Sequence, residues 1–260
     1  MVEYIYSRCT KIFTTSRSFV RSINERGVPL EKIEYWPQYA EDFYKPLDKT
    51  YVEEIPADDT FNIIFTGNIG TAQGLDILPK VALLLKKKNL QKVVRFNIVG
   101  DGRYKGELLK IVNDFGLEDM FNFMPKQPAT RIPELISACD AAFLCFTNSP
   151  IFEMTIPAKL QSYMACGIPI IASAGGEVVK IINEANAGIC SPAGDVEKLA
   201  EIITRLSKMT KEQLKQLGVN AREYYDKNFN KNALLNRIDK YFEVKQPSKN
   251  DRAKEGKVYV

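Results

Sequence analysis

Residues 141–172 read AAFLCFTNSPIFEMTIPAKLQSYMACGIPIIA, and this stretch determines the fold. Ala141–Phe146 is a continuous apolar run, as expected of a strand that is buried on both faces. Pro157–Cys166 carries apolar residues at helical spacing and is followed by Gly167, and Pro169–Ala172 is a second apolar strand. A strand, a helix and another strand in this order predict a βαβ unit with two parallel strands.

The same alternation of strand and helix continues on both sides of this unit. The other expected strands are Asn62–Thr66, Arg95–Val99, Met120–Met124 and Gly188–Cys190, and the other expected helices are Leu75–Lys88, Tyr104–Phe115, Ile132–Ala138, Val196–Lys208, Lys211–Lys227 and Lys231–Glu243. Short apolar strands that alternate with amphipathic helices are typical of parallel sheets. The sequence therefore predicts an α/β fold over residues 61–243, with a Rossmann-like parallel sheet and helices on both of its faces.

The remaining segments flank this predicted domain. Residues 1–46 contain short helix and strand patterns, with too few strands for a core of their own. Residues 47–60 are polar and acidic, which predicts a linker or a surface loop. Residues 244–260 are charged and interrupted by proline, which predicts a loose polar tail.

The composition excludes several classes of protein. With 45% hydrophobic and 26% charged residues, the chain has the composition of an ordinary globular protein. It has no histidine, which excludes a histidine general base, a Ser-His-Asp triad and a histidine-ligated metal supplied by this chain. A net charge of +4, without interleaved aromatic and basic residues, argues against a nucleic-acid partner.

The cysteines and the hydropathy pattern indicate the compartment. The five cysteines are an odd number and form no CxxC motif, so we expect reduced thiols rather than disulfides. No apolar run reaches the roughly 18 residues that a membrane span needs, and the first residues do not resemble a signal peptide. We therefore expect a cytoplasmic protein, for which any membrane contact is peripheral.

Glycines follow two of the predicted strands, at the edge where ligands bind in such sheets. The loop Gly67-Asn68-Ile69-Gly70 follows the first strand, and its glycines would let backbone amides approach a phosphate. A tight turn that needs glycine explains this loop equally well on its own. Gly100-Asp101-Gly102-Arg103 follows the second strand and resembles a dinucleotide fingerprint. The next strand ends at Met124-Pro125-Lys126, without the acid that binds a ribose, which argues against a dinucleotide.

Charged residues lie around the helix that we expect to begin at Pro157, since proline suits the first helical position. Lys159 is in the first turn, where a cation opposes the helix dipole unless both bind the same anion. A solvated surface lysine is the alternative. Glu153 could accept hydrogen bonds from sugar hydroxyls or be an ordinary loop carboxylate. Gly175-Gly176-Glu177, after the next strand, either touches the same ligand or makes a turn.

Five motifs in a fixed order carry a resemblance to a known family. They are IFTTSRSFVRSINERGVPLEKIEYWPQYAEDFYKP (12–46), FTGNIGTAQGLD (65–76), FNIVGDGR (96–103), ACDAAFLCF (138–146) and TIPAKLQSYMACGIPIIAS (155–173). From Ile12 to about Phe242, the chain resembles the C-terminal, donor-binding half of family 4 GT-B glycosyltransferases. The type that it resembles is that of the bacterial enzymes that build cell-surface polysaccharides such as O-antigen, lipopolysaccharide or capsule.

The resemblance implies a domain that binds a nucleotide diphosphate sugar, with UDP as the expected nucleotide. It also implies that the acceptor-binding N-terminal domain is absent from this chain, and that residues 1–46 are the remnant of that domain and its crossover. The chain would then be half of an enzyme, engineered or truncated, and inactive in isolation. A lipid-linked acceptor would give peripheral contact with the inner face of the plasma membrane.

The resemblance also assigns residues. The glycine-rich loop of the family matches Gly67 to Gly74, but Asn68 and Gln73 stand where many members carry Arg and Lys. Lys159 is the candidate to supply the lost charge. The first glutamate of the family pair matches Glu153, which is expected near the donor sugar, and the second, a ribose ligand, falls at Ser162. The other positions expected to line the nucleotide sugar are Gly100, Arg103, Lys126, Ile132 and Thr155.

Glycosyl transfer from a nucleotide diphosphate creates a departing diphosphate, whose negative charge must be stabilised. No Asp-x-Asp motif occurs, so we expect neither a metal nor another cofactor, and stabilisation by Lys159, the N-terminus of its helix and the Gly67–Gly70 amides. Two alternatives stay open at this point. A nucleotide-sugar epimerase would need acid and base carboxylates in the cleft, where we expect only Glu153. A non-catalytic nucleotide-sugar-binding module would explain why the usual cations of the phosphate clamp are missing.

Overall fold

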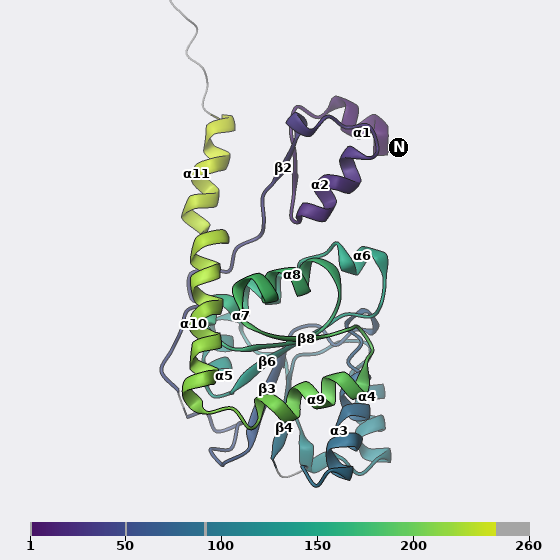
Figure 1. Cartoon of the computed structure of the whole chain (residues 1–260), viewed down its shortest axis with the longest axis vertical. Coiled ribbons are helices and arrows are strands. Elements are labelled where there is room, and N and C mark those ends of the chain that lie inside the picture. The colour runs from purple at the N-terminus through teal and green to yellow at the C-terminus, as the bar shows by residue number, and fades with distance from the viewer. Residues whose placement is uncertain (1, 50, 91–92, 243–260) are drawn as a thin grey trace, which may run out of the picture.

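The computed structural model describes residues 2–49, 51–90 and 93–242, so the predicted tail at 244–260 lies outside the described residues. Six parallel strands form the main sheet, in the order β5-β4-β3-β6-β7-β8 (Figure 1). Their bounds are β3 Phe61–Thr66, β4 Val94–Val99, β5 Phe121–Met124, β6 Ala141–Cys145, β7 Ile170–Ser173 and β8 Gly188–Ser191. The predicted Rossmann-like parallel sheet is therefore confirmed.

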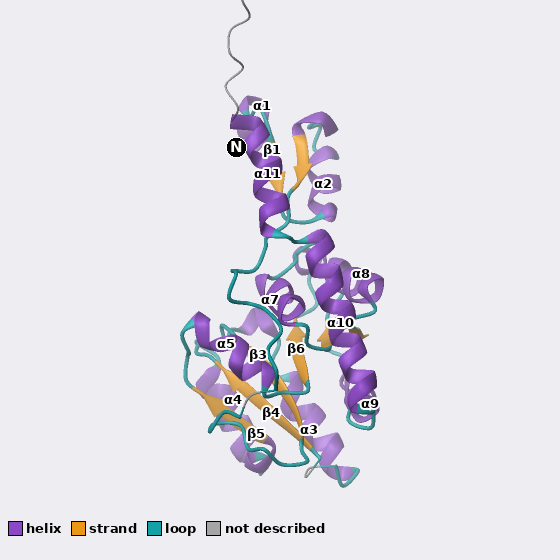
Figure 2. Cartoon of the chain, turned by 90° about the vertical axis from the view of Figure 1, so that its left-hand side faces the viewer, coloured by secondary structure: helices purple, strands orange, loops and turns teal. Residues whose placement is uncertain are grey.

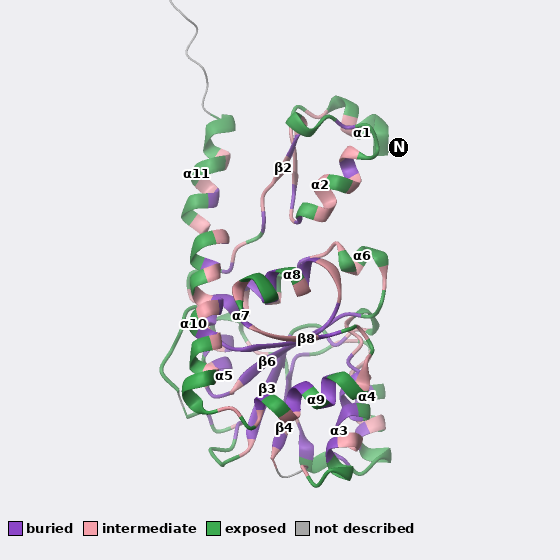
Figure 3. Cartoon of the chain, viewed as in Figure 1, coloured by how far each residue is buried: buried purple, intermediate pink, exposed green. Residues whose placement is uncertain are grey.

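Helices cover both faces of the sheet, as predicted. One face packs against α3 (Ile77–Lys87), α4 (Lys105–Asp114) and α9 (Val196–Leu206), and the other against α5 (Ile132–Ser137), α7 (Ala158–Cys166), α8 (Gly176–Ala185) and α10 (Lys211–Asn228). Strand β3 is buried along its whole length, with Ile64 in one core and Ile63 and Phe65 in the other (Figure 3). Alternate side chains of the same strand thus enter opposite layers, which explains why its sequence is continuously apolar.

Two local details differ from the predictions. A four-residue helix, α6 (Pro150–Glu153), lies in the segment predicted as a loop, and its last residue is Glu153. Pro157 is not the first helical residue, because its backbone is extended (φ −75°, ψ 142°) and it forms the N-cap of α7. The expected N1 position was therefore wrong by one residue, since a proline φ suits the extended cap as well as the helix.

The first elements form a separate small unit that consists of β1 (Ile12–Thr14), α2 (Arg17–Asn24) and β2 (Ile33–Tyr35); we call it the β1–α2–β2 unit. A helix, α1 (Val2–Arg8), precedes it, and its two strands pair in parallel. Only Ile23, Val28 and Ile33 are buried in its own cluster. As the sequence indicated, two short strands are too few for an independent core.

The last helix, α11 (Lys231–Phe242), runs back to this unit and contacts its two strands, for example through the Phe13 and Tyr241 rings, which lie 5.3 Å apart (Figure 2). The Trp36 indole donates a hydrogen bond to the Leu234 carbonyl at 3.1 Å, and Arg237 pairs with Glu34 at 2.9 Å. Contacts between residues about 200 positions apart therefore hold the β1–α2–β2 unit against α11.

The segment predicted as a linker, 47–60, has no helix and packs on the domain in its described part. Val52 and Ile55 form an isolated bridge and are both buried in the core. The Glu54 carboxylate pairs with Arg131 at 2.5 Å, while its carbonyl accepts a hydrogen bond from Asn122. Through these contacts the segment covers the sheet near β5.

The five cysteines are all unpaired, and three of them are buried. Among the helices of the described residues, none is both long enough and apolar enough to cross a membrane.

Candidate functional site

The sheet opens at the point where its strand order reverses, between β3 and β6. These neighbouring strands pair only at Ile63–Ala141 and Ile64–Ala142, and their carboxyl ends then separate. Tyr163 of α7, which is fully buried, fills the gap: its hydroxyl accepts a hydrogen bond from the Thr66 amide at 2.9 Å and lies 3.2 Å from the Thr66 hydroxyl. Open α/β sheets bind ligands at such a reversal point.

Replacing Tyr163 with phenylalanine should lower the free energy of unfolding by about 1–3 kcal/mol, because the Thr66 amide would be left buried without an acceptor. Urea denaturation measures the change. Tyr224→Phe is the matched control, since that hydroxyl bonds to an exposed Glu184 and its loss should cost less. Equal effects of the two substitutions would contradict this role of Tyr163.

The glycine-rich loop after β3 interlocks with the loop after β4. Gly67 has a φ of +127° and Gly100 a φ of +146°, in a region that side chains rarely allow. A Cβ atom on Gly100 would overlap the Gly67 carbonyl oxygen, so the two backbones approach as closely as glycine permits. The Ile69 amide donates to the Asp101 carbonyl at 2.8 Å, and the Ile69 carbonyl accepts from Tyr104 at 3.1 Å. Backbone hydrogen bonds thus fix the loop.

These hydrogen bonds correct one part of the expected phosphate clamp. The Gly67 amide donates to the Val99 carbonyl and the Ile69 amide to that of Asp101, so neither is free for a phosphate. The amides of Asn68 and Gly70 make no hydrogen bond within the part of the chain that the structure describes. Only these two of the four predicted amides can therefore bind an anion.

The Lys159 side chain lies directly under this loop. Its Nζ donates to the Gln73 amide oxygen at 2.8 Å and lies 3.9 Å from the centroid of the Phe65 ring. It also lies 3.7 Å from the place that a Cβ atom on Gly67 would occupy. Burial lowers the pKa of Lys159 to about 8, and no described carboxylate pairs with it. The ammonium is thus held in place by a neutral amide and a ring, and its charge is not neutralised.

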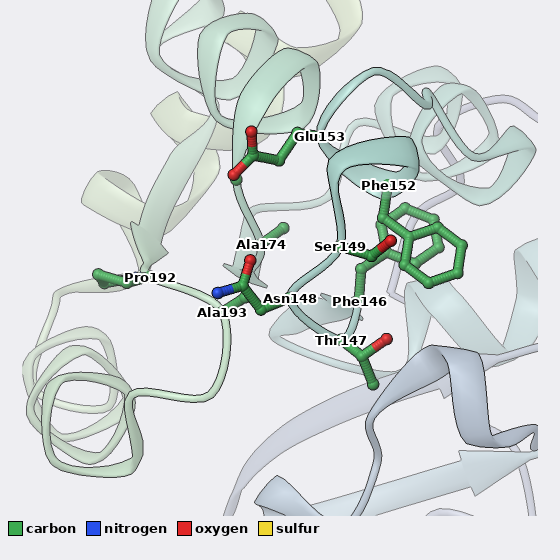
Figure 4. Close-up of a pocket in the computed structure, with 10 residues that line it drawn as sticks. Phe146, Thr147, Asn148, Ser149, Phe152, Glu153, Ala174, Pro192 and Ala193 are labelled. Atoms are coloured by element: carbon green, nitrogen blue, oxygen red, sulfur yellow. The ribbon is translucent and has the colours of Figure 1, made fainter.

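A cavity of about 170 Å³ lies beside the loop, at the carboxyl ends of β6, β7 and β8 (Figure 4). Its walls include Asn148, Glu153 and Pro192. The Phe146 and Phe152 rings are stacked 4.8 Å apart, on the side of the Ser149 loop opposite the Asn148 amide (Figure 4). The cavity is therefore lined by one carboxylate, one side-chain amide and the hydroxyl residues Thr147 and Ser149, beside apolar surfaces.

The Glu153 side chain packs against the beginning of α8. A Cβ atom on Gly175 would lie 3.4 Å from the Glu153 carboxylate oxygen, and one on Gly176 would overlap the Glu153 carbonyl. Glycine is thus needed here for close approach, and Gly176 also has a positive φ of +59°. The pair thus forms a turn and Gly175 also lines the cavity, while contact with the ligand stays a prediction.

The structure brings some predicted residues together and separates others. Those around the Lys159 amine or in the interlocked loops are Gly67, Asn68, Ile69, Gly70 and Gly100, although the Ile69 side chain is fully buried in the core. Glu153 lies at the cavity, and Arg103 and Lys126 are exposed near the ends of β4 and β5. Ile132 is buried in the core, so only its backbone could contact a ligand.

Two predicted hydroxyls bond to helix carbonyls four residues earlier in the chain instead of pointing freely into the cleft. The Thr155 hydroxyl donates to the Ile151 carbonyl at 2.7 Å, and the Ser162 hydroxyl donates to the Ala158 carbonyl at 3.2 Å. The Tyr44 side chain lies near Ser162, which places Ser162 beside the crossover segment. A ribose would have to compete with these bonds.

The sequence did not single out Tyr163, Phe65 or Asn148. Tyr163 could have been noticed, because it lies four residues after Lys159 and hence on the same side of α7. Phe65 and Asn148 carry no such signal, since their roles depend on which strands are neighbours. In the described residues, no group of three or more cysteine, aspartate or glutamate side chains is placed to hold a metal ion.

Residues 49–224 match the model of the family described as glycosyl transferases group 1. The putative colanic acid biosynthesis glycosyltransferase WcaL of Salmonella typhimurium is 24% identical over 73% of this chain and 50% of its own length. WcaI of Escherichia coli, which is also named as a putative colanic acid biosynthesis glycosyl transferase, is 27% identical over 86% of this chain and 54% of its own length. The chain thus spans about half the length of these curated relatives.

The fold has close counterparts among solved structures. Anabaena HepE, crystallised with UDP-glucose, superposes with a TM-score of 0.72 at 19% identity, over 90% of this chain and 63% of its own. The family resemblance inferred from the five motifs is therefore confirmed. Since the family model matches more than half of its length, this chain belongs to the group 1 glycosyl transferases and has the fold of the GT-B glycosyltransferases.

Proposed function

We propose that this chain binds the diphosphate of a nucleotide sugar, with UDP as the nucleotide, for transfer of the sugar to a polysaccharide or lipid-linked acceptor. One observation carries the proposal: the ammonium of Lys159 lies under the glycine-rich loop and has no carboxylate partner among the described residues. A half-buried cation without a counterion is costly, and a bound anion removes that cost. HepE, a neighbour of the same fold, was crystallised with UDP-glucose, which supports this ligand class.

The proposed chemistry follows from the charges at the site. When the bond between the sugar and the diphosphate breaks, negative charge grows on the leaving diphosphate oxygen. Lys159, the N-terminus of α7 and the free amides of Asn68 and Gly70 would stabilise this charge. The lysine thus takes the place of the Arg and Lys that Asn68 and Gln73 replace.

The cavity next to this site is where we place the donor sugar. Glu153 would accept hydrogen bonds from sugar hydroxyls, and the Asn148 amide would donate to one. Glu153 is the only carboxylate among the described residues that line the cavity, which disfavours an epimerase that needs an acid and a base. Transfer to an acceptor also needs the second half of the enzyme, which we infer from the relatives, because the match covers only 50–54% of their length.

Calorimetry with UDP, UMP and uridine on the present chain tests this function. We expect UDP to bind much more tightly than UMP or uridine, because the second phosphate reaches Lys159. The absence of a metal requirement stays a prediction, and the same titration with Mg²⁺ and with EDTA tests it. UDP that binds no better than uridine would contradict the proposed function.

The affinity for UDP should depend on pH because of Lys159. Its pKa in the free protein is lowered to about 8, so the ammonium form predominates below pH 8 and is lost above it. A bound diphosphate requires the charged form, and binding above pH 8 must therefore take up a proton. We expect constant affinity between pH 6.5 and 7.5, and a fall of up to about tenfold per pH unit above pH 8.

The Lys159→Arg variant is the control for this pH dependence, because arginine stays charged throughout the range. Its affinity for UDP should not fall between pH 8 and pH 9.5. A fall of the same size in both proteins would show that a group other than Lys159 titrates.

Localisation and partners follow as further proposals. We propose that a lipid-linked acceptor brings the enzyme to the inner face of the plasma membrane, in the cytoplasm. The relatives named for colanic acid biosynthesis support a cell-surface polysaccharide product.

A further inference from the structure

Glu177, in the first turn of α8, makes a contact that the nucleotide site does not use. One of its carboxylate oxygens accepts a hydrogen bond from the Ser18 amide at 2.8 Å and a second from the Ser18 hydroxyl. Ser18 lies in the first turn of α2, where the Ser16 side chain caps the Phe19 amide. The carboxylate thus completes the N-terminus of a helix that belongs to the β1–α2–β2 unit.

This carboxylate is buried without a cation. Glu177 is only 5% exposed, and among the described side chains no lysine or arginine forms an ion pair with it. Its charge is balanced by the Ser18 donors and by the positive end of α2. If the β1–α2–β2 unit moved away, water would solvate the carboxylate and the helix end, so the contact can open without leaving a buried charge.

The contact between Ser18 and Glu177 lies on the side of the β1–α2–β2 unit opposite the crossover segment, which connects the unit covalently to the rest of the chain. On one side, the unit is held through Trp36 and Glu34 to α11, close to the crossover segment. On the other side, the two hydrogen bonds to Glu177 are the only hydrogen bonds or ion pairs between described residues of the unit (12–35) and residues 61–206. This geometry is that of a hinge on one side and a latch on the other.

The residues next to Glu177 in the sequence also contact the cavity in which we place the donor sugar. Glu177 directly follows Gly176, whose backbone touches the Glu153 carbonyl, and Gly175 lines the cavity. The position of α2 is therefore linked through the first turn of α8 to the wall that carries Glu153.

We propose that Glu177 is a positioning residue that latches the β1–α2–β2 unit onto the first turn of α8 and thereby holds the Glu153 wall of the cavity. The proposal does not depend on the identity of the nucleotide. It requires that loss of the Glu177 acceptor increases the mobility of both α2 and residues 149–154. The contacts of Trp36 and Glu34 with α11 should persist.

Amide hydrogen exchange of the present chain tests the latch. In Glu177→Ala, we expect the amides of residues 17–20 to exchange at least about tenfold faster, and those of residues 149–154 to exchange faster as well. Trp36, the only tryptophan of the chain, reports on the hinge, and its fluorescence should not change. Glu177→Gln keeps an acceptor oxygen and should restore much of the protection, which a loss of packing alone would not predict.

Glu184→Gln is the matched control, because Glu184 lies on the same helix but bonds to Tyr224 of α10. It should leave the exchange of residues 17–20 unchanged. Unchanged exchange there in Glu177→Ala would overturn the latch, and so would an equal effect of Glu184→Gln. Faster exchange at 17–20 alone, with 149–154 unaffected, would overturn the link to the cavity.

If Glu177→Ala does not fold, Ser18→Ala tests the same contact from its less buried partner. It removes the hydroxyl donor and keeps the amide, so exchange at 17–20 should increase by a smaller factor. No increase would overturn the proposal.

Discussion

Lys159→Ala should weaken the binding of UDP to this chain by about 100-fold or more, with little change in stability. Truncating one partner of a buried, hydrogen-bonded charge pair between a protein and its binding partner costs about 2–5 kcal/mol of binding free energy. The expected loss is of this size because no other described cation lies under the glycine-rich loop: Lys105 donates to the Gly100 carbonyl, and Arg103 is exposed. Calorimetry at pH 7 measures the dissociation constant of UDP for the Lys159→Ala variant and for the unchanged chain, and the ratio of the two tests the prediction.

The stability of this variant should change little, because the lysine contributes no ion pair to the fold. Its ammonium is half-buried against Phe65, and burial disfavours the charge, as the lowered pKa of Lys159 shows. Lys80→Ala is the control, since that exposed lysine pairs with Asp76 on α3, away from the loop. If Lys159→Ala binds UDP as tightly as Lys80→Ala does, the lysine does not hold the diphosphate.

The location of this site could be predicted from the sequence because it depends on local features. The strand that ends at Thr66, the glycines after it and the first turn of the helix that carries Lys159 can each be recognised within a few residues. The rule that parallel strands present their carboxyl ends on one edge then brings the segments together. The family resemblance added that Gln73 replaces a cation, which gave Lys159 its predicted role.

The features that could not be predicted from the sequence depend on which strands are neighbours and on contacts between residues that are distant in sequence. The Ile69 amide is unavailable to a phosphate because it bonds to the Asp101 carbonyl of the adjacent loop. The α6 helix has only four residues, too few for a hydrophobic period. The bond between Ser18 and Glu177 spans 159 residues, so no local pattern could have distinguished that buried carboxylate from a turn residue.

Gly100→Ala should be strongly destabilising, with a loss of about 3 kcal/mol or more in the free energy of unfolding. Two costs add: the residue has a φ of +146°, which alanine rarely adopts, and the new Cβ atom would overlap the Gly67 carbonyl oxygen. The backbone cannot move aside easily. The Gly100 amide donates to the Met124 carbonyl, and the Gly67 amide donates to that of Val99, so both segments are tied to the sheet.

Gly106→Ala is the matched control for this substitution, with an effect of the opposite sign. Gly106 lies in α4, and a Cβ atom there would meet nothing within 4 Å. Alanine should therefore stabilise the helix by about 0.5–1 kcal/mol, because it has less backbone entropy to lose than glycine. Urea denaturation of both variants tests the argument: equal midpoints would show that the loops after β3 and β4 can separate, and that their close approach does not hold the Asn68 and Gly70 amides in place for a phosphate.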